Sequence, residues 1–306
     1  MSLFSEKLLR TFCKVVEHGG FSGAQYDLGI SQPAISNHIR DLEIILGYRL
    51  CERGRSGFHL TDRGQQTYER CRKMLIQFED FESDLLGLRN TLKGSLRIGV
   101  VDAHLTNPAL PISTAINNFF DRENDIEFQF HVAPPNELEL ELINGTLHLA
   151  IGPFTQKIEG LSYQYLSSEH HSLYCGASHP LFNASSNKIT PQIIEDHQLC
   201  LRSYNTHSGL ELLKGKGQTA LVSNMEAQAS LILSGKFLGA LPDHYAKRWV
   251  ARGDLKALKH KDLSWTSDFH LATRQSPAQR EIIKLFTQDF LNLISLETSP
   301  QETSQS

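Results

Sequence analysis

The stretch SQPAISNHIRDLE, residues 31–43, decides how the N-terminal part of this chain folds. On a helix, apolar residues separated by four, three and four positions form one stripe, and this spacing is met by Ile35, Ile39, Leu42 and Leu46. Another face carries the residue types that contact base edges and phosphates, namely Pro33, Ser36, Asn37 and Arg40. Ser31 is a suitable N-cap, and a proline in the first turn costs no hydrogen bond. We therefore expect the helix to begin directly after Ser31.

Two shorter helices are predicted before this one. Residues 2–17 repeat leucine, phenylalanine and valine at helical spacing, and the Gly19-Gly20 pair ends the pattern. Residues 21–28 form the second helix, and Gly29 with Ile30 makes a tight turn. Two helices joined by a short turn containing glycine, with a polar outer face on the second helix, are the helix-turn-helix pattern.

A small hairpin is predicted next. Short runs at residues 49–52 and 58–61 flank the turn-rich GRSG. This hairpin would be the wing of a winged helix, and Arg53 and Arg55 near its tip would reach phosphates or the minor groove.

The distribution of charge permits DNA binding although the net charge of the chain is −4. Residues 1–60 carry seven Lys and Arg against six Asp and Glu, whereas residues 93–306 carry 18 against 22. A local basic patch is sufficient, and one is formed by Arg49, Arg53, Arg55 and Arg63.

A long helix follows the hairpin. Thr61 is placed to cap it, and no proline interrupts the chain before about residue 90. Apolar residues separated by 4, 3, 4, 3 and 4 positions form a heptad seam for pairing with a second copy: Met74, Phe78, Phe81, Leu85, Leu88 and Leu92. The alternative is an amphipathic helix that packs on its own domain.

From residue 96 onward, short apolar strands alternate with helices. Lys93-Gly94-Ser95 is the predicted hinge into this region. Strands are predicted at residues 96–101, 126–132, 147–152, 166–176 and 237–242, and helices at 106–120, 137–144, 225–235 and 276–294, with another helix starting at Thr190 and leading into QLCLRS. This alternation predicts a parallel sheet with crossover connections, which places the region in the α/β class.

The five cysteines are scattered without a C-x-x-C pair, which favours free buried thiols in a reducing compartment. The N-terminus lacks the basic start and apolar core of a signal peptide, and no run of 18 apolar residues exists. We therefore expect a cytoplasmic protein without a membrane partner.

Motifs with fixed spacing run through the first 64 residues: Leu9, Phe12, GGFSGA from residue 19, SQPAIS from residue 31, LE at 42–43, LG at 46–47, ER at 52–53 and LT-x-x-G at 60–64. This set resembles the LysR-type transcriptional regulators. The second half resembles the same family more loosely, in GSLRIGV, INGTLHLAIG, HPLF and SGKFLGALP. Five positions depart from the family pattern: Gln25, where a second small residue is often found, Cys51 in place of a common Phe, Asn37 and His38, which we expect to alter base preference, and His148 in place of the usual Asp.

The resemblance implies a winged helix-turn-helix domain at residues 1–61, a linker and dimerisation helix at 62–92, and a two-lobed, periplasmic-binding-protein-like (Rossmann-like) effector domain at 93–300. Lobe I would comprise about 94–163 and 267–300, and lobe II about 164–266, with a disordered tail at 301–306. The implied partners are a dyad-symmetric promoter site in double-stranded DNA, a small-molecule effector, further copies of the chain in a homodimer or homotetramer, and RNA polymerase.

Candidate contact residues follow from this arrangement. For DNA they are Ser31, Gln32, Pro33, Ser36, Asn37, Arg40, Arg53, Arg55 and Thr61. An effector would bind between the lobes, where strands end and helices begin. The candidates there are Asp102, Ala103, His104, Thr106, Pro134, Asn136, Pro153, Phe154, Leu201, Arg202, Ser203, Asn224 and Pro242. Arg202 would suit an anion and Asp102 would repel one, so the effector's charge stays open.

No catalytic residue, metal site or cofactor is predicted. A G-x-S-x-G elbow and an H-E-x-x-H motif are both absent. His170 and His171 would point to opposite faces of a strand, which does not suit a shared metal. The expected function is therefore a DNA-binding transcriptional regulator, and the alternative is a cytoplasmic small-molecule-binding protein or enzyme on a two-lobed fold.

Overall fold

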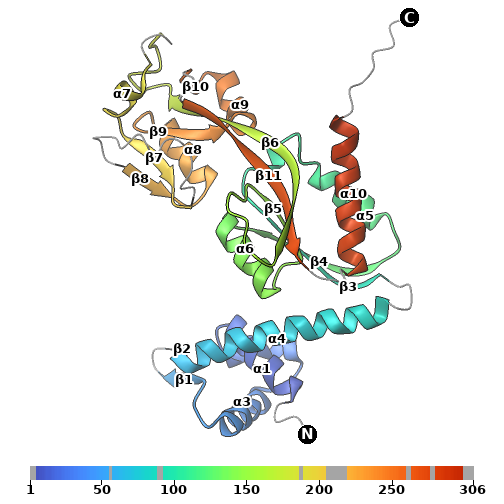
Figure 1. Cartoon of the computed structure of the whole chain (residues 1–306). Coiled ribbons are helices and arrows are strands. Elements are labelled where there is room, and N and C mark those ends of the chain that lie inside the picture. Colours follow the sequence, from blue (N-terminus) through green and yellow to red (C-terminus); the bar gives the residue numbers. More distant parts are fainter. Residues whose placement is uncertain are drawn as a thin grey trace, which may run out of the picture. The chain divides into compact units, whose positions relative to one another are not determined.

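The computed structural model describes residues 5–54, 57–87, 92–185, 189–204, 219–259, 263–275 and 280–298. It divides into two compact units, Met1–Ser95 and Leu96–Ser306 (Figure 1). Among the described residues no helix is both long enough and apolar enough to cross a membrane. All five cysteines are free and buried, as expected.

The N-terminal unit is a winged helix-turn-helix followed by a long helix. Its elements are α1 (Glu6–Glu17), α2 (Phe21–Leu28), α3 (Gln32–Leu46), β1 (Cys51–Gly54), β2 (Gly57–Leu60) and α4 (Asp62–Gly87). Ile35, Ile39 and Leu42 are buried in a core with Phe12 and Val15 of α1, and Leu46 packs against the same core. The predicted apolar stripe of α3 is thus confirmed, and so is the order of helices and wing.

The start of α3 differs in one detail from the prediction. Gly29 ends α2 with a φ of +61°, a left-handed conformation that glycine adopts without strain, and Ser31 then precedes α3 in an extended conformation. The Ser31 side chain, however, accepts no capping hydrogen bond, so its predicted role as a side-chain cap is wrong. The predicted start of the first helix at residue 2 lies outside the described residues.

The wing joins α4 through a tight backbone contact. β1 and β2 pair in antiparallel fashion from Cys51 opposite Leu60 to Gly54 opposite Gly57. Thr61 caps α4 as predicted, since its Oγ1 accepts a hydrogen bond of 2.9 Å from the Gly64 N–H. A Cβ at position 64 would overlap the carbonyl oxygen of Leu50, so only glycine fits there. This contact explains the glycine of the LT-x-x-G motif.

The C-terminal unit contains one mixed sheet of nine described strands. They are β3 (Lys93–Val100), β4 (Asp125–Val132), β5 (Leu149–Gly152), β6 (Leu161–Gly176), β7 (Leu199–Arg202), β8 (Thr219–Val222), β9 (Leu238–Pro242), β10 (Leu255–Ala257) and β11 (Ser264–Arg274). Their order is β4-β3-β5-β11-β6-β9-β7-β8, and β10 pairs with β6. The helical elements are η1 (His104–Thr106), α5 (Ile112–Phe120), α6 (Pro135–Asn144), α7 (Pro191–Ile194), α8 (Met225–Leu233), α9 (Asp243–Arg252) and α10 (Glu281–Thr298).

Two long antiparallel strands join the lobes. β6 and β11 pair from Leu161 opposite Arg274 to Ser172 opposite Ser264. At one end β5 pairs with β11, and at the other β9 pairs with β6 (Figure 1). We call the part built from β3, β4, β5, α5, α6 and α10 lobe I, and the part built from β7–β10 and α7–α9 lobe II. Parallel pairing occurs within each lobe, between β3 and β5 and between β7 and its two neighbours.

Some element boundaries were predicted wrongly. The predicted hinge at residues 93–95 belongs to β3. The helix expected from Thr106 begins at Ile112, because Pro108 and Pro111 lack the N–H groups that an earlier helix would use. α7 has four residues, and the following LCLR is strand β7. Helix α9 and strands β8, β10 and β11 were not predicted.

Replacing Gly64 with alanine should destabilise the N-terminal unit by about 1–3 kcal/mol, since the added methyl group displaces backbone of residue 50. Urea unfolding followed by circular dichroism measures this change. Gln65→Ala, one position later and exposed, is the matched control and should stay within about 0.5 kcal/mol of wild type. Equal stability of both variants would contradict the proposed contact.

Candidate functional site

The outer face of α3 presents polar side chains opposite its buried stripe. Gln32, Pro33, Asn37 and Arg40 are exposed, and Ser36 is half-buried. The Nη2 of Arg40 donates a 2.9 Å hydrogen bond to Oδ1 of Asn37, so both groups lie on one surface.

Neither neighbouring acid pairs with Arg40 in the described part of the chain. The carboxylate of Glu43 instead accepts a 2.7 Å hydrogen bond from the Leu50 N–H. Among the described residues Arg40 is thus held by Asn37 and not by an ion pair with Asp41 or Glu43.

His38 faces the interior more than the sequence suggested. Its Nδ1 lies 3.0 Å from Oγ1 of Thr11 on α1, and the Thr11 side chain is buried. A role for His38 in base preference is not supported by this geometry, because its ring is held toward α1. Asn37 remains exposed.

The predicted DNA contacts at the wing are Arg53, Arg55 and Thr61, and the predicted basic patch adds Arg49 and Arg63. Arg49 and Arg63 are exposed, and the guanidinium of Arg63 lies 5.4 Å from the centroid of the Tyr48 ring. The Thr61 hydroxyl donates to the carbonyl oxygen of Arg49 at 2.8 Å, so it is occupied within the fold. The side chain of Arg53 and the whole of Arg55 lie outside the described residues.

Helix α4 leaves a row of large apolar side chains exposed. Its Thr67, Cys71 and Leu75 are buried within the N-terminal unit. The predicted seam is not covered, with exposed fractions of 43% for Met74, 37% for Phe78, 56% for Phe81 and 50% for Leu85. Leu92 is half-buried, and Leu88 lies outside the described residues. The helix thus packs on its own unit with one face and presents an apolar row on another.

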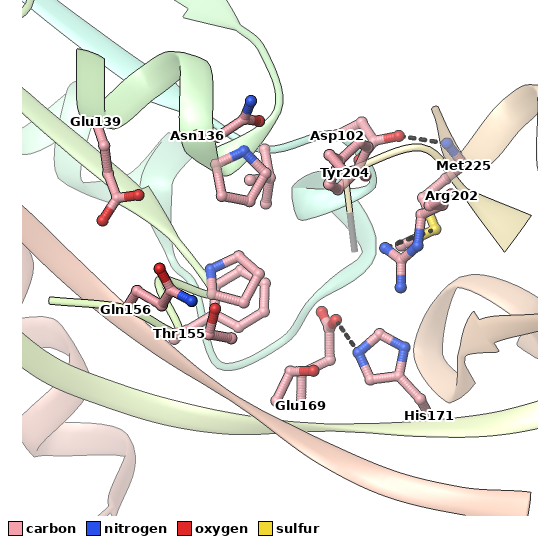
Figure 2. A pocket seen from close by; sticks show the side chains of 15 residues that line it. Asp102, Asn136, Glu139, Thr155, Gln156, Glu169, His171, Arg202, Tyr204 and Met225 are labelled. Carbon is pink, nitrogen blue, oxygen red and sulfur yellow. Dashed lines mark hydrogen bonds and ion pairs between the residues drawn. The ribbon is translucent and has the colours of Figure 1, made fainter. Parts of the chain in front are cut away.

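A separate pocket lies within the C-terminal unit, between its two lobes. Its volume is about 190 Å³. It is lined from lobe I by Val101, Asp102, Pro135, Asn136, Glu139, Pro153, Thr155 and Gln156, from lobe II by Arg202, Tyr204 and Met225, and from the connecting strands by Glu169, His171, Ser267 and Phe269 (Figure 2).

The lobe II side of the pocket carries a guanidinium. Arg202 ends β7, and its Nη1 lies 3.5 Å from the sulfur of Met225, while its guanidinium lies 5.7 Å from the centroid of the Tyr204 ring. Among the described residues it forms no ion pair with a carboxylate. Asp102 nearby accepts hydrogen bonds from the Met225 N–H at the N-terminus of α8 and from the Tyr204 hydroxyl. Asp102 thereby links lobe I to lobe II.

The base of the pocket holds a buried carboxylate. Glu169 on β6 lies 2.9 Å from Nε2 of His171 and 2.7 Å from Nε2 of His244, and it accepts a 3.1 Å hydrogen bond from Asn107. Burial alone would raise the pKa of Glu169, but the hydrogen bonds and charges of the two histidines lower it to about 2. Burial lowers the pKa of His171, whose ring stacks on Trp265 at a centroid distance of 5.6 Å.

The lobe I side is rich in hydrogen-bond acceptors. Asn136 and Glu139 lie on α6, and Thr155 and Gln156 follow β5 (Figure 2). The Glu139 carboxylate accepts a 2.6 Å hydrogen bond from the Tyr163 hydroxyl. Burial raises the pKa of Glu139, and this hydrogen bond partly offsets the rise.

One group of side chains on lobe I has a spacing that could hold a metal ion. Ligand atoms of His131, Glu137 and Glu141 lie within 4.8 Å of one another, in the described part of the chain. None of the three lines the pocket, and His131 and Glu137 are exposed. Exposed carboxylates commonly cluster without a metal, so this group carries no assignment.

Family models match both units. A model described as "Bacterial regulatory helix-turn-helix protein, lysR family" matches residues 7–65, and one described as "LysR substrate binding domain" matches residues 89–292. The chain belongs to the LysR family of transcriptional regulators. The family suggested by the sequence motifs is thereby confirmed, with its DNA-binding helix-turn-helix and its effector-binding domain.

Individual proteins agree with this assignment. The HTH-type transcriptional activator BauR of Pseudomonas aeruginosa is 34% identical over 94% of this regulator and 94% of its own length. The structure of full-length CbnR in complex with its target DNA has a TM-score of 0.67 at 18% identity, covering 95% of this regulator and 99% of CbnR. A full-length OxyR variant from Pseudomonas aeruginosa has a TM-score of 0.63 at 19% identity, with 94% of each chain covered. These structures support the fold.

In this LysR-family regulator, four of the predicted effector residues line the pocket, namely Asp102, Asn136, Pro153 and Arg202. Other predicted residues occupy structural positions beside it. Thr106 bonds the ring of His244, His104 bonds the carbonyl oxygen of Val101, and Asn224 caps α8 through the Ala227 N–H. Outside the lining are also Ala103, Pro134, Phe154, Leu201, Ser203 and Pro242.

The prediction missed Glu139, Gln156, Glu169, His171 and Tyr204, all of which line the pocket. One signal for two of them was present in the sequence. Glu169 and His171 are two positions apart on a strand and therefore share a face. A glutamate and a histidine on one face of a strand indicate a polar site on that face, which the neighbouring His170 does not share.

The low pKa of Glu169 predicts an acid-sensitive contribution to stability. Because the folded pKa of about 2 lies below the ordinary value of 4.5, the stabilisation is present above pH 4.5 and is lost as the pH falls toward 2. The difference in unfolding free energy between wild type and Glu169→Gln should shrink by roughly 2 kcal/mol between pH 5 and pH 3. Urea unfolding at several pH values measures it. A difference that is constant over this range would contradict the ionised, histidine-paired state.

Proposed function

We propose that this LysR-family regulator reads a dyad-symmetric promoter site with the outer face of α3, aided by the basic wing. The observation that carries the proposal is the pair of exposed side chains Asn37 and Arg40, held opposite the buried stripe of the same helix. An amide and a guanidinium are the groups that form two-point hydrogen bonds with adenine and guanine edges in the major groove. CbnR, which shares this fold, was solved in complex with its target DNA.

We further propose that α4 pairs two copies through its exposed apolar row. One recognition helix reads few base pairs, and pairing supplies a second helix for the other half-site, one or more helical turns away. The row from Met74 to Leu85 is too large and too regular for a solvent-facing surface. Dimers could assemble further into tetramers.

The pocket between the lobes is the proposed effector site. A ligand regulates only if it binds one conformation of the protein better than another. The pocket meets this requirement because its lining comes from both lobes, so a bound molecule is sensitive to their separation. We also propose that the regulator contacts RNA polymerase at the promoter. The relatives are transcriptional regulators, which favours this function over a ligand-binding protein or enzyme.

Replacing Arg40 with alanine should weaken binding to a promoter fragment by about 1–3 kcal/mol and relax preference at one base pair, if Arg40 contacts a base. Fluorescence anisotropy with the promoter and single-base variants measures both effects. Arg70→Ala, which removes an exposed arginine on α4, is the matched control. Unchanged affinity and preference in Arg40→Ala would refute this docking.

Replacing Arg49 with alanine should instead reduce the slope of log K against log salt by about one, as expected for a phosphate contact.

Replacing Phe81 with glutamate should dissociate the dimer while leaving the folded unit intact, because this side chain is 56% exposed. A charge placed in an apolar helix seam loses its hydration without gaining a partner. Sedimentation velocity measures the oligomeric state. Gln77→Glu adds the same charge to an exposed position outside the seam and should remain dimeric. A Phe81→Glu protein that sediments like wild type would rule out this seam.

A further inference from the structure

The pocket between the lobes presents opposite charges from opposite lobes. Arg202 of β7 lines it from lobe II, and Glu139 of α6 lines it from lobe I. Figure 2 shows these two side chains on opposite sides of the pocket, with Gln156 and Thr155 beside the glutamate side. A single ligand that satisfies both sides must therefore carry a positive group at one end and a negative group at the other.

Arg202 is available for an anionic group. It forms no ion pair with a carboxylate within the described residues, and its guanidinium contacts the sulfur of Met225 and the Tyr204 side chain, to which it also forms a hydrogen bond. A guanidinium binds a carboxylate with two parallel hydrogen bonds, and such bonds are strong when they are shielded from water. The N-terminus of α8 lies beside it, but its Met225 N–H is already bonded to Asp102. The guanidinium is thus the main anion-binding group of this side.

The opposite side suits an ammonium group. Glu139 is only 7% exposed, and it accepts a hydrogen bond from the Tyr163 hydroxyl, which occupies one of its acceptor positions. A carboxylate has about four acceptor positions. The side-chain oxygens of Gln156 and Thr155 supply neutral acceptors on the same side. An ammonium has three donors and no acceptor, which matches this set.

The other two carboxylates in the lining already accept several hydrogen bonds each. Glu169 is held by His171, His244 and Asn107, and Asp102 bonds the Met225 N–H and the Tyr204 hydroxyl. The volume of about 190 Å³ is below the roughly 300–1,000 Å³ of pockets for drug-sized ligands, so the ligand is small.

We propose that the effector is a small amino acid, in the general sense of a molecule with one ammonium and one carboxylate. Its carboxylate binds Arg202 and its ammonium binds Glu139, so the ligand connects the two lobes. An acid or an amine alone engages only one lobe. This inference rests on the proposed effector site and adds the class of ligand.

The test uses the full-length protein and compounds that share a four-carbon chain and differ in their end groups. These are 4-aminobutyrate, butyrate, butylamine, succinate and putrescine. Because the position of the amino group is not fixed, the standard amino acids and short unbranched ω-amino acids are screened in parallel, each with its deaminated and decarboxylated analogues. Thermal shift and isothermal titration calorimetry detect binding, since a ligand specific for the folded state raises its apparent stability.

At least one amino acid should bind roughly tenfold or more tightly than its acid or amine analogue. Glu139→Gln, which keeps an acceptor for Tyr163, should abolish the preference for the amino acid over the acid. Arg202→Gln should abolish the preference over the amine. Glu137→Gln on the same helix and Arg252→Gln on α9 lie outside the lining and should leave both preferences unchanged.

Promoter binding by each variant is measured in the same series by fluorescence anisotropy. If promoter binding is intact but no amino acid binds better than its analogues, the ligand class is wrong while the regulatory function stands. The same conclusion holds if succinate binds best, or if Glu139→Gln keeps the wild-type preference. Loss of promoter-specific binding by the wild-type protein would instead refute the proposed function.

Discussion

The burial of one stripe of α3 is the constraint on which the DNA-binding unit depends. Ile35, Ile39 and Leu42 are removed from water against α1, and each such side chain contributes about 1.5–3 kcal/mol. A helix turns by a fixed angle per residue. When this stripe is buried, Asn37 and Arg40 therefore face outward. The same packing fixes the turn at Gly29 and the position of the wing, where Gly64 meets the backbone of residue 50.

In the C-terminal unit a corresponding constraint comes from the paired strands β6 and β11. Both strands contribute to the pocket, and both continue into the two lobes. Alternation along β6 places Glu169 and His171 on the pocket side, while His170 bonds Asp243 at 2.6 Å on the other side. The proposed ligand site is thus built on the elements that join the lobes. A molecule bound there would contact both lobes directly.

The N-terminal unit could be predicted from sequence in detail because its information is local. Helical periodicity, glycine turns and the cap at Thr61 act over a few residues, and α2 begins and ends where the pattern indicated. Two inferences from local sequence, on His38 and on Ser31, were wrong. His38 is held by Thr11, which lies 27 positions away in the sequence, and the Ser31 hydroxyl makes no capping bond although its residue type favours one.

The pocket could be predicted only in part, because its lining is assembled from distant segments. Asp102 and Arg202 could be predicted from the rule that ligands bind where the strands of a sheet end. The β11 residues Ser267 and Phe269 could not be predicted in this way, since their positions depend on how β11 returns beside β5 and β6. Strand β11 itself, SWTSDFHLATR, mixes polar and apolar residues and gave no clear strand signal.

Sequence-specific binding by a dimer requires that two copies of the outward face of α3 contact one DNA site. A hydroxyl-radical footprint of the full-length protein on its own promoter region measures this directly. We expect two protected segments related by a dyad, with centres separated by about 10–10.5 base pairs or a multiple of that spacing. Protection of a single segment, or uniform protection that does not depend on sequence, would contradict recognition by paired α3 helices.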